Sequence, residues 1–561
     1  MGQSNVEKIG RRLAISKVLR GFSGSLTTMA IIPSLQFLSA CSDKKKPKDL
    51  KAIPVQDKVK IHTTSYKLGH KARGDSFPTP KSKIEIDTLV IGGGISGLSA
   101  GWYFKSKGYD NFAIIELEAV EGGNSRSGKN QNSMFPLGAH YLPIPNLNYS
   151  DLINFLDCAG VITGYSSEGI PIYNDYYLCF EPFERLYKSG AWQDGLIPKN
   201  YNNNTVSIEF EKFFQIMEEF KSAIGNDKKN AFTIPIEFCS QDPRYRELDN
   251  TSFKQYLISN NFQTEELFWY VDYCCNDDFG AFSDKISAWA GIHYFSSRTG
   301  KAINANSSQV LTWPEGNNFL VKQLSKNISD HIKTNSLVFK MTHENGKWHC
   351  LVYDSVLNQS IEYIANQCIV ATPQFVNKHI IKDYSKTYGN PDWEFNPWFV
   401  ANLSIRNASI LSKKSELSWD NVIYGSSNLG YVNALQQSVK RFNDKAQITY
   451  YQPVHHLTSN ESRRFLLERN PAWFWTEIIE NLSVAHPEIA SEIEEVDVFI
   501  HGHGMIGPKV GFLSDEVRNN LKQSTNGLSF VHTDVSGISI FEEAFFRGVE
   551  AAKKIVNSNQ S

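Results

Sequence analysis

Two glycine-rich segments near opposite ends of the chain hold the residues with the clearest capacity for chemistry. The first, residues 92–97, reads Gly-Gly-Gly-Ile-Ser-Gly and lies between an apolar run, 88–91, and a stretch with helical spacing. In such a strand, turn and helix, the first glycine allows the tight turn, the second lets a diphosphate approach the backbone, and the third lets helix and strand pack closely. The N–H groups at the helix start bind the anion. This pattern predicts a dinucleotide site.

A second apolar run, 112–115, ends in a carboxylate that suits the same ligand. Glu116 follows the glycines by about 20 residues, the spacing at which an acid accepts hydrogen bonds from both hydroxyls of an adenosine ribose. Gly122 and Gly123 come shortly after it, followed by Asn124 and Ser125. Because a nicotinamide site needs no second glycine pair, these residues favour a flavin dinucleotide.

The second glycine-rich segment, residues 530–537, reads Phe-Val-His-Thr-Asp-Val-Ser-Gly and precedes a helical stretch that ends near Ile555. At these two segments, and at turns in 312–317 and 367–373, the chain resembles the FAD-dependent amine oxidase superfamily, which includes monoamine and polyamine oxidases, protoporphyrinogen oxidase and carotenoid desaturases. The resemblance implies an α/β fold, in which a Rossmann-like FAD domain of the glutathione-reductase type carries an inserted α+β substrate domain. It also implies non-covalent FAD, because no cysteine matches the family's attachment position.

The resemblance extends the set of FAD-binding residues. Asp534 stands where the family's acid contacts the ribityl and pyrophosphate region, and the backbone of Val338 where the family meets the adenine. The start of the last helix would face the flavin pyrimidine edge, where its dipole stabilises negative charge. Glu543 stands where many relatives have glycine. The implied FAD-binding residues are Gly92, Gly94, Ile95, Ser96, Gly97, Glu116, Gly122, Gly123, Asn124, Ser125, Val338, Asp534, Phe541 and Glu542.

Between these segments, hydrophobic patterns predict the elements that hold them. Strand-like runs flank Asn345-Gly346, a hairpin turn, and further strands are expected at 399–405 and 446–452, with helices at 207–223 and 471–481. The predicted FAD-binding domain consists of three separated segments, 84–145, 301–389 and 496–561. The predicted substrate-binding domain consists of 146–300 and 390–495.

Clusters of glycine, histidine and aromatic residues supply the candidates for contact with a substrate. In the amine oxidases, aromatic side chains flank the substrate nitrogen, and a desolvated aromatic pocket favours the neutral amine whose lone pair drives hydride transfer to the flavin. His140 follows the glycine pair at the distance where relatives run alongside the flavin, so it is the first candidate, with a packed core histidine as the alternative. The other candidates, for which core packing is also an alternative, are Trp289, His293, Tyr431 and His503.

One departure from the family leaves other functions open. Many amine oxidases place a lysine beside the flavin N5 nitrogen, but the corresponding stretch, 398–406, has none. One alternative is therefore a desaturase-like or quinone-reducing dehydrogenase that acts on a C–C bond, and another is a non-catalytic flavin-binding protein of the cell envelope. The expected electron acceptor is dioxygen or a membrane quinone.

The N-terminus resembles a twin-arginine lipoprotein signal. Arg11 and Arg12 precede a mildly apolar stretch, 21–40, which ends in Leu-Ser-Ala before Cys41. Pro33 interrupts the apolar part, which is too short to span a bilayer. The twin-arginine translocase carries folded proteins, so FAD can be inserted before export. A disordered basic N-terminus is the alternative.

This signal predicts where the protein works. We expect residues 1–41 to be the signal peptide, Cys41 to carry lipid, and the mature protein to be a membrane-anchored lipoprotein that faces the periplasm of a bacterium. Residues 42–83 are basic, polar and rich in proline, which predicts a flexible linker.

The composition predicts a large apolar core without an excess of charge. Of 561 residues, 41% are hydrophobic, and the formal net charge of −2 gives no basic footprint for nucleic acid. Eight cysteines are scattered along the chain; for Cys274 and Cys275 we expect buried thiols, with a vicinal disulfide as the alternative. We expect no metal, because the sequence has no CxxC pair and no histidines with metal-ligand spacing.

Overall fold

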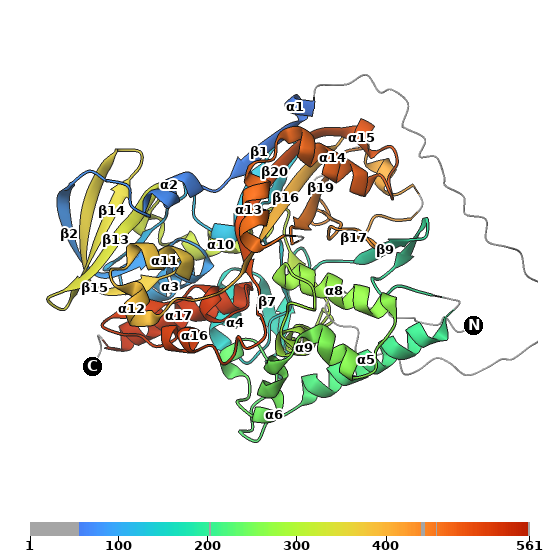
Figure 1. The fold of residues 1–561 in the computed structure, drawn as a ribbon, viewed down its shortest axis with the longest axis horizontal. Helices are drawn as coiled ribbons and strands as arrows, with labels where there is room; N and C mark the ends of the chain where they lie inside the picture. Colours follow the sequence, from blue (N-terminus) through green and yellow to red (C-terminus); the bar gives the residue numbers. More distant parts are fainter. Residues whose placement is uncertain (1–54, 201–202, 414, 439–443, 456, 559–561) are drawn as a thin grey trace, which may run out of the picture.

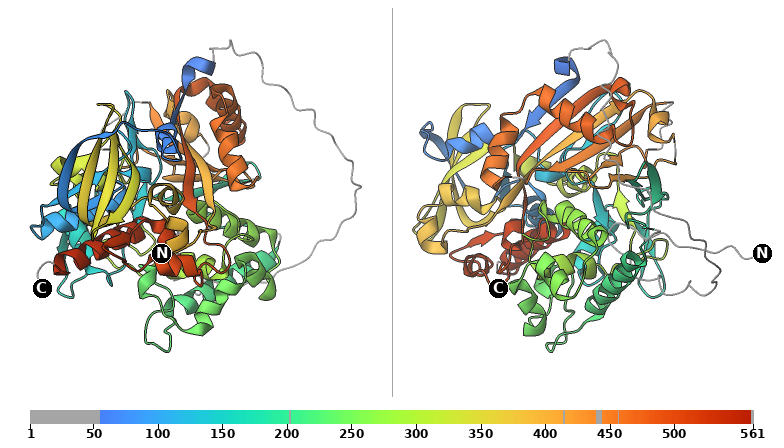
Figure 2. Two further views of the ribbon diagram at one scale, coloured as in Figure 1. Left: turned by 60° about the vertical axis from the view of Figure 1, so that its left-hand side comes forward. Right: turned by 45° about the vertical axis from the view of Figure 1, so that its right-hand side comes forward.

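The computed structural model describes residues 55–561 apart from 201–202, 414, 439–443, 456 and 559–561. Two large β-sheets stand side by side, and a group of helices lies below the second one (Figures 1 and 2). The predicted α/β class is confirmed. The predictions on residues 1–54, including the twin-arginine pair and Cys41, lie outside the described residues.

The seven-stranded sheet carries the first glycine-rich turn. Its strands follow the order β12-β3-β2-β15-β14-β13, and β21 also pairs with β15. Strands β2 and β15 run parallel over 12 residues each, and the hairpin predicted at Asn345-Gly346 joins β13 to β14. The strands are β2 (Pro80–Ile91), β3 (Phe112–Ile115), β12 (Ile332–Lys333), β13 (Ser336–Glu344), β14 (Lys347–Asp354), β15 (Gln359–Val370) and β21 (Leu528–Phe530).

Two helices from opposite ends of the chain pack together on this sheet. Helix α3 (Ile95–Ser106) follows the glycine turn, and helix α17 (Phe541–Ser558) crosses it. A Cβ atom at Gly548 of α17 would lie 2.0 Å from the carbonyl oxygen of Ser96, so only glycine allows this approach. Helices α4 (Ser150–Cys158) and α10 (Asn318–Ser325) add to the same apolar cluster. This packing brings the C-terminal segment beside the glycine turn.

The central strands β16 and β19 of the eight-stranded sheet are buried on both faces. The strand order of this sheet is β1-β20-β16-β19-β18-β17-β9-β10. Along β16, Phe399, Ala401 and Leu403 join one apolar cluster, and Trp398 and Val400 join another, as the alternation of a strand requires. The strands are β1 (Val59–Thr63), β9 (Glu184–Lys188), β10 (Ala191–Asp194), β16 (Phe395–Ile405), β17 (Asp420–Ile423), β18 (Tyr431–Asn433), β19 (Ala446–Pro453) and β20 (Ile493–Ile506).

Helices cover both faces of this second sheet. On one face lies α14 (Pro471–Leu482), which begins where the side chain of Asn470 caps the N–H of Trp473 and Pro471 fixes the first turn. Beside it lies α13 (Ser459–Leu467). The other face meets a helical group, green in Figure 1. That group consists of α5 (Asn204–Ser222), α6 (Pro243–Arg246), α7 (Phe253–Ser259), α8 (Glu265–Phe279) and α9 (Ala288–Ser296).

Short elements complete the described chain. The small strands form three pairs, in which β4 pairs with β5, β6 with β11 and β7 with β8. Their bounds are β4 (Ser127–Lys129), β5 (Met134–Pro136), β6 (Tyr141–Pro143), β7 (Ile162–Tyr165), β8 (Pro171–Tyr173) and β11 (Val310–Thr312). The remaining α-helices are α1 (Val55–Lys58), α2 (Tyr66–Lys71), α11 (Gln374–Ile380), α12 (Tyr384–Tyr388), α15 (Ile489–Glu492) and α16 (Glu516–Leu521).

The linker prediction for residues 42–83 is wrong from residue 55 onward. Strand β1 adds to the edge of the eight-stranded sheet, parallel to β20, where Lys60 pairs with Glu495 and His62 Nε2 lies 2.9 Å from Asp497 Oδ1. The charged residues of this segment suggested a solvated spacer, but they belong to an edge strand that has one solvent-exposed face. The segment then crosses to the seven-stranded sheet, so it straps the two sheets together (Figure 1).

Two of the domain boundaries predicted from the sequence differ from those in the structure. Strand β20 pairs with β16 as far as Ile506, so the part of the predicted FAD-binding segment 496–561 up to that residue belongs to the second sheet. Helix α4, which was assigned to the substrate part, packs with α3 and α17 through Phe155 and Phe545. Both boundaries depend on long-range packing, which local patterns do not reveal.

Candidate functional site

The glycine turn after β2 has the geometry that an anion requires. Gly92 adopts φ 103°, and a Cβ atom at Gly97 would lie 2.0 Å from the carbonyl oxygen of Gly92, so both positions need glycine. Gly94 is the N-cap of α3 in an extended conformation, and because glycine has no side chain it makes no capping hydrogen bond to the helix start. Ile95 and Ser96 form the first turn of α3, whose backbone N–H groups are therefore available to a phosphate.

Glu116 lies beside this turn and is 8% exposed. Its Oε2 accepts a hydrogen bond of 2.7 Å from Gly93 N–H, and its Oε1 accepts one of 2.8 Å from Glu118 N–H. Burial raises the pKa of Glu116, although these two N–H groups oppose the shift. Each carboxylate oxygen keeps a lone pair, so the fixed carboxylate fits the two hydroxyls of a ribose.

The second glycine pair packs directly on the first turn. Gly122 N–H donates to the carbonyl oxygen of Gly93 at 2.8 Å, and a Cβ atom at Gly123 would lie 3.4 Å from Gly94 Cα. Both glycines have positive φ, 115° and 56°. Asn124 and Ser125 continue as a short 3-10 turn, in which Ser125 N–H bonds to the Gly122 carbonyl at 2.9 Å. The pair therefore forms one cradle with the first turn.

Arg126, which no motif in the sequence indicated, supports this cradle. Arg126 Nε donates to the carbonyl oxygen of Gly123 at 3.0 Å, and its guanidinium pairs with Glu118 at 3.1 Å. The same Glu118 carboxylate accepts from the N–H and hydroxyl of Ser65 at the start of α2. The sequence signal was an arginine close behind the glycine pair, which is too common to single out.

Asp534 is fully buried and has one carboxylate oxygen available to a ligand. Oδ2 accepts from Gln374 N–H at 2.7 Å, whereas Oδ1 has no hydrogen-bond partner among the described residues. The ring of His532 lies 3.3 Å from Oδ1, but its Nδ1 accepts from the Asp534 N–H instead. A buried acceptor without a donor is costly, so Oδ1 fits a hydroxyl of a bound ligand.

The remaining predicted cofactor residues surround this cradle. Ser336 N–H at the start of β13 donates to the Glu116 carbonyl at 2.8 Å, which brings the buried Val338 near the ribose acid. At the start of α17, Glu542 forms a buried ion pair with Arg298. Glu543 accepts from Ile236 N–H and from the Ser536 hydroxyl, so both of its carboxylate oxygens are engaged within the protein. Together, the cradle fits a dinucleotide with its ribose at Glu116 and its diphosphate at α3.

A cavity of ≈ 170 Å³ lies between the cradle and the eight-stranded sheet. Its walls include Asn124 behind the glycine pair and Phe541 and Glu542 at the start of α17. The opposite walls come from the eight-stranded sheet, from the segment that leads into β6 and from helix α8, and they include His140, Tyr141, Trp398, Tyr451, Asp277 and Asp278. The cavity therefore joins residues predicted to bind the cofactor to an aromatic wall that carries two carboxylates.

His140 is held firmly in this wall. Its ring stacks on Tyr451 with centroids 4.6 Å apart and meets Tyr141 edge-on at 4.7 Å. Its carbonyl oxygen accepts from the Thr312 hydroxyl at 2.8 Å. A Cβ atom at Gly138 would lie 2.5 Å from the carbonyl oxygen of Asn124, so the segment runs directly along the cradle. His140 thus lines the cavity beside the cradle, and its contact with a flavin ring stays a prediction.

The structure does not bring the other candidates to this cavity. Trp289 and His293 are buried on α9, where their rings stack at 4.9 Å and His293 Nε2 bonds to the Thr233 carbonyl at 2.9 Å. Burial lowers the pKa of His293 to about 4. Tyr431 points into the core of the second sheet and bonds to Arg185 and His486. These three side chains pack the core.

His503 also lies away from the cavity. Its ring stacks on Phe375 of α11 with centroids 3.9 Å apart, whereas His501 and Gly504 line the cavity. A register shift between β16 and β20, at Asn396 and Trp398, breaks the alternation of side chains here. Two residues spaced by two in a regular strand share a face, so the sequence could not separate His501 from His503. Only the register shift places His501 in the cavity and His503 outside it.

Within the part of the chain that the structure describes, neither a membrane-spanning helix nor a metal site is found, and two adjacent cysteines are free. The described helices include none long and apolar enough to cross a membrane. Among those same residues, no three His, Cys, Asp or Glu side chains converge as metal ligands. The expectation for Cys274 and Cys275 is confirmed, since both are buried free thiols.

Comparisons with known proteins agree with this fold. Residues 90–159 match the family described as NAD(P)-binding Rossmann-like domain. No curated protein matches the chain. Putrescine oxidase bound to putrescine and cyclohexylamine oxidase from Brevibacterium oxydans each share 14% identity and a TM-score of 0.61, over 85% of this chain and 100% of theirs. A conjugated-linoleic-acid-producing fatty acid isomerase from P. acnes shares 12% identity and a TM-score of 0.56, over 84% and 98%. At these identities the likeness shows the fold.

Proposed function

We propose that this protein is an FAD-dependent oxidoreductase that takes a hydride from an amine or a related substrate. The observation that carries the proposal is the cavity of ≈ 170 Å³, where the glycine cradle, the start of α17 and the aromatic wall around His140 meet. Bound FAD would supply the electron sink that accepts the hydride. Its ribose would be held by Glu116, its diphosphate by α3 and its ribityl chain by Asp534.

The walls of the cavity favour an amine. Asp277 Oδ2 lies 3.5 Å from the Tyr141 hydroxyl, and Asp278 lines the same space, so the cavity attracts a cationic substrate. The rings of His140, Trp398 and Tyr451 exclude water, and desolvation then favours the neutral amine that can lose a hydride. Glu542, in the first turn of α17, is neutralised by its pairing with Arg298, so the N-terminus of α17 would stabilise negative charge on a reduced cofactor bound beside it.

The alternative is a dehydrogenase or desaturase that acts on a C–C bond. Strand β16 contains no lysine, and its Trp398 and Val400 line the cavity instead. One structural neighbour with this fold carries the name of a fatty acid isomerase. A non-catalytic flavin-binding envelope protein is the remaining alternative.

We further propose that the twin-arginine translocase exports the folded, FAD-loaded chain and that lipid on Cys41 anchors it to a membrane, facing the periplasm. The support is the arrangement of Arg11, Arg12 and Cys41 in the sequence. A membrane quinone or dioxygen would then accept the electrons.

The experiment is anaerobic reduction of the purified protein with a panel of polyamines, monoamines, amino acids and polyene lipids. Loss of the oxidised flavin absorbance with an amine supports the proposal, and subsequent recovery with dioxygen distinguishes an oxidase from a dehydrogenase. Reduction by polyene lipids alone would replace the amine proposal with the C–C alternative. A flavin that no donor reduces would favour the non-catalytic protein.

A further inference from the structure

Arg298 brings a buried positive charge to the wall of the cavity beside the glycine cradle. It follows helix α9 in the helical group, lines the cavity and is 5% exposed. Among the described residues, its guanidinium has a single hydrogen-bond partner, Glu542, which accepts from Nη1. A guanidinium donates along more than one edge of a planar fork. The edge formed by Nε and Nη2 is therefore available to a ligand.

The backbone on both sides of Arg298 is fixed by one buried amide. Asn146 Nδ2 donates to the Ser297 carbonyl oxygen at 2.8 Å, and Asn146 Oδ1 accepts from Thr299 N–H at 2.8 Å. Asn146 is itself 8% exposed, so water does not compete for these bonds. Because the guanidinium also holds Glu542, little conformational entropy is left to lose when its free edge binds a ligand.

Two carboxylates from another helix line the same cavity. Asp277 and Asp278 lie near the end of α8, whereas Arg298 is paired at the first turn of α17. The cavity wall thus presents negative and positive groups on different elements. A ligand with an amine alone would match the carboxylates but would leave buried N–H donors of Arg298 without an acceptor, which is costly. A ligand that carries both an amine and a carboxylate matches both.

The two partners in the Arg298–Glu542 pair come from different parts of the chain. Glu542 belongs to the C-terminal segment predicted to bind the cofactor, whereas Arg298 belongs to residues 146–300, which were predicted to bind the substrate. Arg298 therefore reaches the cavity from the helical group, and the N–H groups at the start of α17 are left to the flavin.

We propose that Arg298 binds a carboxylate of the substrate, so that the substrate is an amino acid. The inference rests on the proposed function, because it names the substrate class of the same cavity. The Nε–Nη2 edge offers two parallel N–H groups, which match the two oxygens of a carboxylate. The reaction is the one already proposed: the nitrogen lone pair forms a C=N bond as the hydride leaves the carbon for FAD, which gives a protonated imine and reduced flavin.

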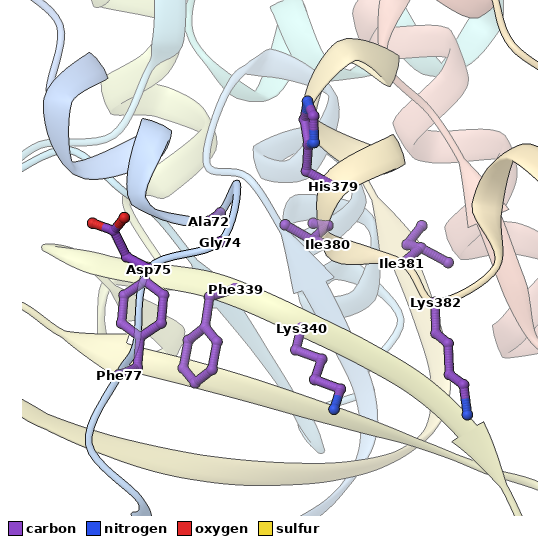
Figure 3. A pocket seen from close by; sticks show the side chains of 10 residues that line it. All are labelled: Ala72, Gly74, Asp75, Phe77, Phe339, Lys340, His379, Ile380, Ile381 and Lys382. Atoms are coloured by element: carbon purple, nitrogen blue, oxygen red, sulfur yellow. The ribbon is translucent and has the colours of Figure 1, made fainter.

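A second cavity, under residues 72–77, is a weaker candidate for a charged ligand. Its volume is ≈ 380 Å³, and its walls include Lys340, Lys382, His379 and Asp75. Figure 3 shows the amines of Lys340 and Lys382 pointing away from His379. All four of these charged or titratable side chains belong to exposed residues, so their ion pairs would be weak.

The test compares ligands that differ only in their charged groups. Each set contains an amino acid, the amine without its carboxylate and the acid without its amine: phenylalanine, phenethylamine and hydrocinnamate; leucine, isoamylamine and isocaproate; alanine, ethylamine and propionate. The acids cannot reduce flavin, so calorimetry on the purified full-length protein measures their binding alone. Anaerobic stopped flow measures flavin reduction by the amines and by both enantiomers of the amino acids.

The variants separate the fork of Arg298 from its charge. Arg298→Lys keeps a positive partner for Glu542 and loses the fork. A double variant, Arg298→Gln with Glu542→Gln, removes both charges and so leaves no buried charge unpaired if the single variant fails to fold. The matched control is Arg406→Gln, which removes an exposed arginine that pairs with Glu492 outside the cavity. FAD titration into each cofactor-free protein reports on the cofactor separately.

The wild-type and control proteins should bind at least one of the acids. Both Arg298 variants should weaken that binding by about tenfold or more, the loss expected for one hydrogen bond to a charged group. The half-saturating concentration of the matching amino acid should rise by the same factor, whereas that of the amine should not change.

Three outcomes would overturn the inference: none of the acids binds, the variants leave acid binding unchanged, or the variants weaken FAD binding alone, which would assign Arg298 to the cofactor. Flavin reduction by amines in a protein that binds no acid would sink the carboxylate site and leave the proposed function standing. Acid binding that depends on Arg298, in a protein whose flavin no donor reduces, would do the reverse.

Discussion

Replacing Glu116 with glutamine should weaken FAD binding while leaving the fold intact. The carboxylate is held by Gly93 N–H at 2.7 Å and by Glu118 N–H at 2.8 Å, which leaves its remaining lone pairs directed at a ribose. An amide has one oxygen in place of two, so Glu116→Gln loses a hydrogen bond to a charged acceptor and turns an NH₂ group toward a backbone donor. The loss of one such bond costs about 1.5 to 3 kcal/mol, which corresponds to roughly 10- to 150-fold in Kd.

The assay is quenching of FAD fluorescence on titration into cofactor-free protein. The control is Glu85→Gln, which removes an exposed carboxylate from the same strand as the glycine turn. Thermal unfolding of the cofactor-free proteins checks that the fold survives. A Glu116→Gln protein that folds and binds FAD as tightly as the control would refute the assignment of the ribose acid, and Glu118 would become the next candidate.

Three further predictions test other parts of the molecule. His140→Ala should slow flavin reduction, measured by anaerobic stopped flow, more than it weakens FAD binding. An unchanged reduction rate with lowered thermal stability would show that His140 serves only in core packing. His293 has a pKa of about 4 in the folded protein against 6.5 unfolded, so its contribution to stability is complete above pH 6.5 and declines as pH falls toward 4. Denaturant titrations should show that His293→Gln removes ~2 kcal/mol of the stability difference between pH 7 and pH 5, and an unchanged difference would contradict the shift. Changing Arg11 and Arg12 to lysine should block export, whereas Cys41→Ala should give exported protein without lipid; fractionation and lipid labelling separate the two, and envelope localisation of the double-lysine protein would require another route.

The cofactor cradle could be predicted because its determinants are local. Gly92 and Gly97 are needed for a turn and a helix contact that the intervening residues form by themselves, and Glu116 ends the next strand of the same sheet. The hairpin at Asn345-Gly346 followed from turn chemistry in the same way. Such features depend on backbone geometry over short distances, so their residue types reveal them.

The aromatic wall could be predicted only in part. His140 lies a short way beyond the glycine pair, so its place followed from that local geometry. Asp277 and Arg298 reach the cavity from helices and loops whose docking depends on the whole core, and no local pattern identifies them. The prediction for Tyr431 was wrong because a glycine next to an aromatic residue does not determine which face of a sheet the ring occupies.

The segment that contains β1 and connects the two large sheets was mispredicted for a related reason. Residues 59–63 alternate charged and apolar side chains, which fits an edge strand as well as a solvated spacer. Only the pairing with β20, between segments more than 430 residues apart, distinguishes the two.

Acid denaturation of the purified protein tests the central claim most directly. The glycine cradle, Glu116 and Asp534 predict a yellow protein that releases intact FAD into the supernatant, in a ratio near one per chain. Yellow colour that stays with the precipitated chain would contradict non-covalent binding. A colourless protein that takes up no FAD on reconstitution would contradict the flavin site itself.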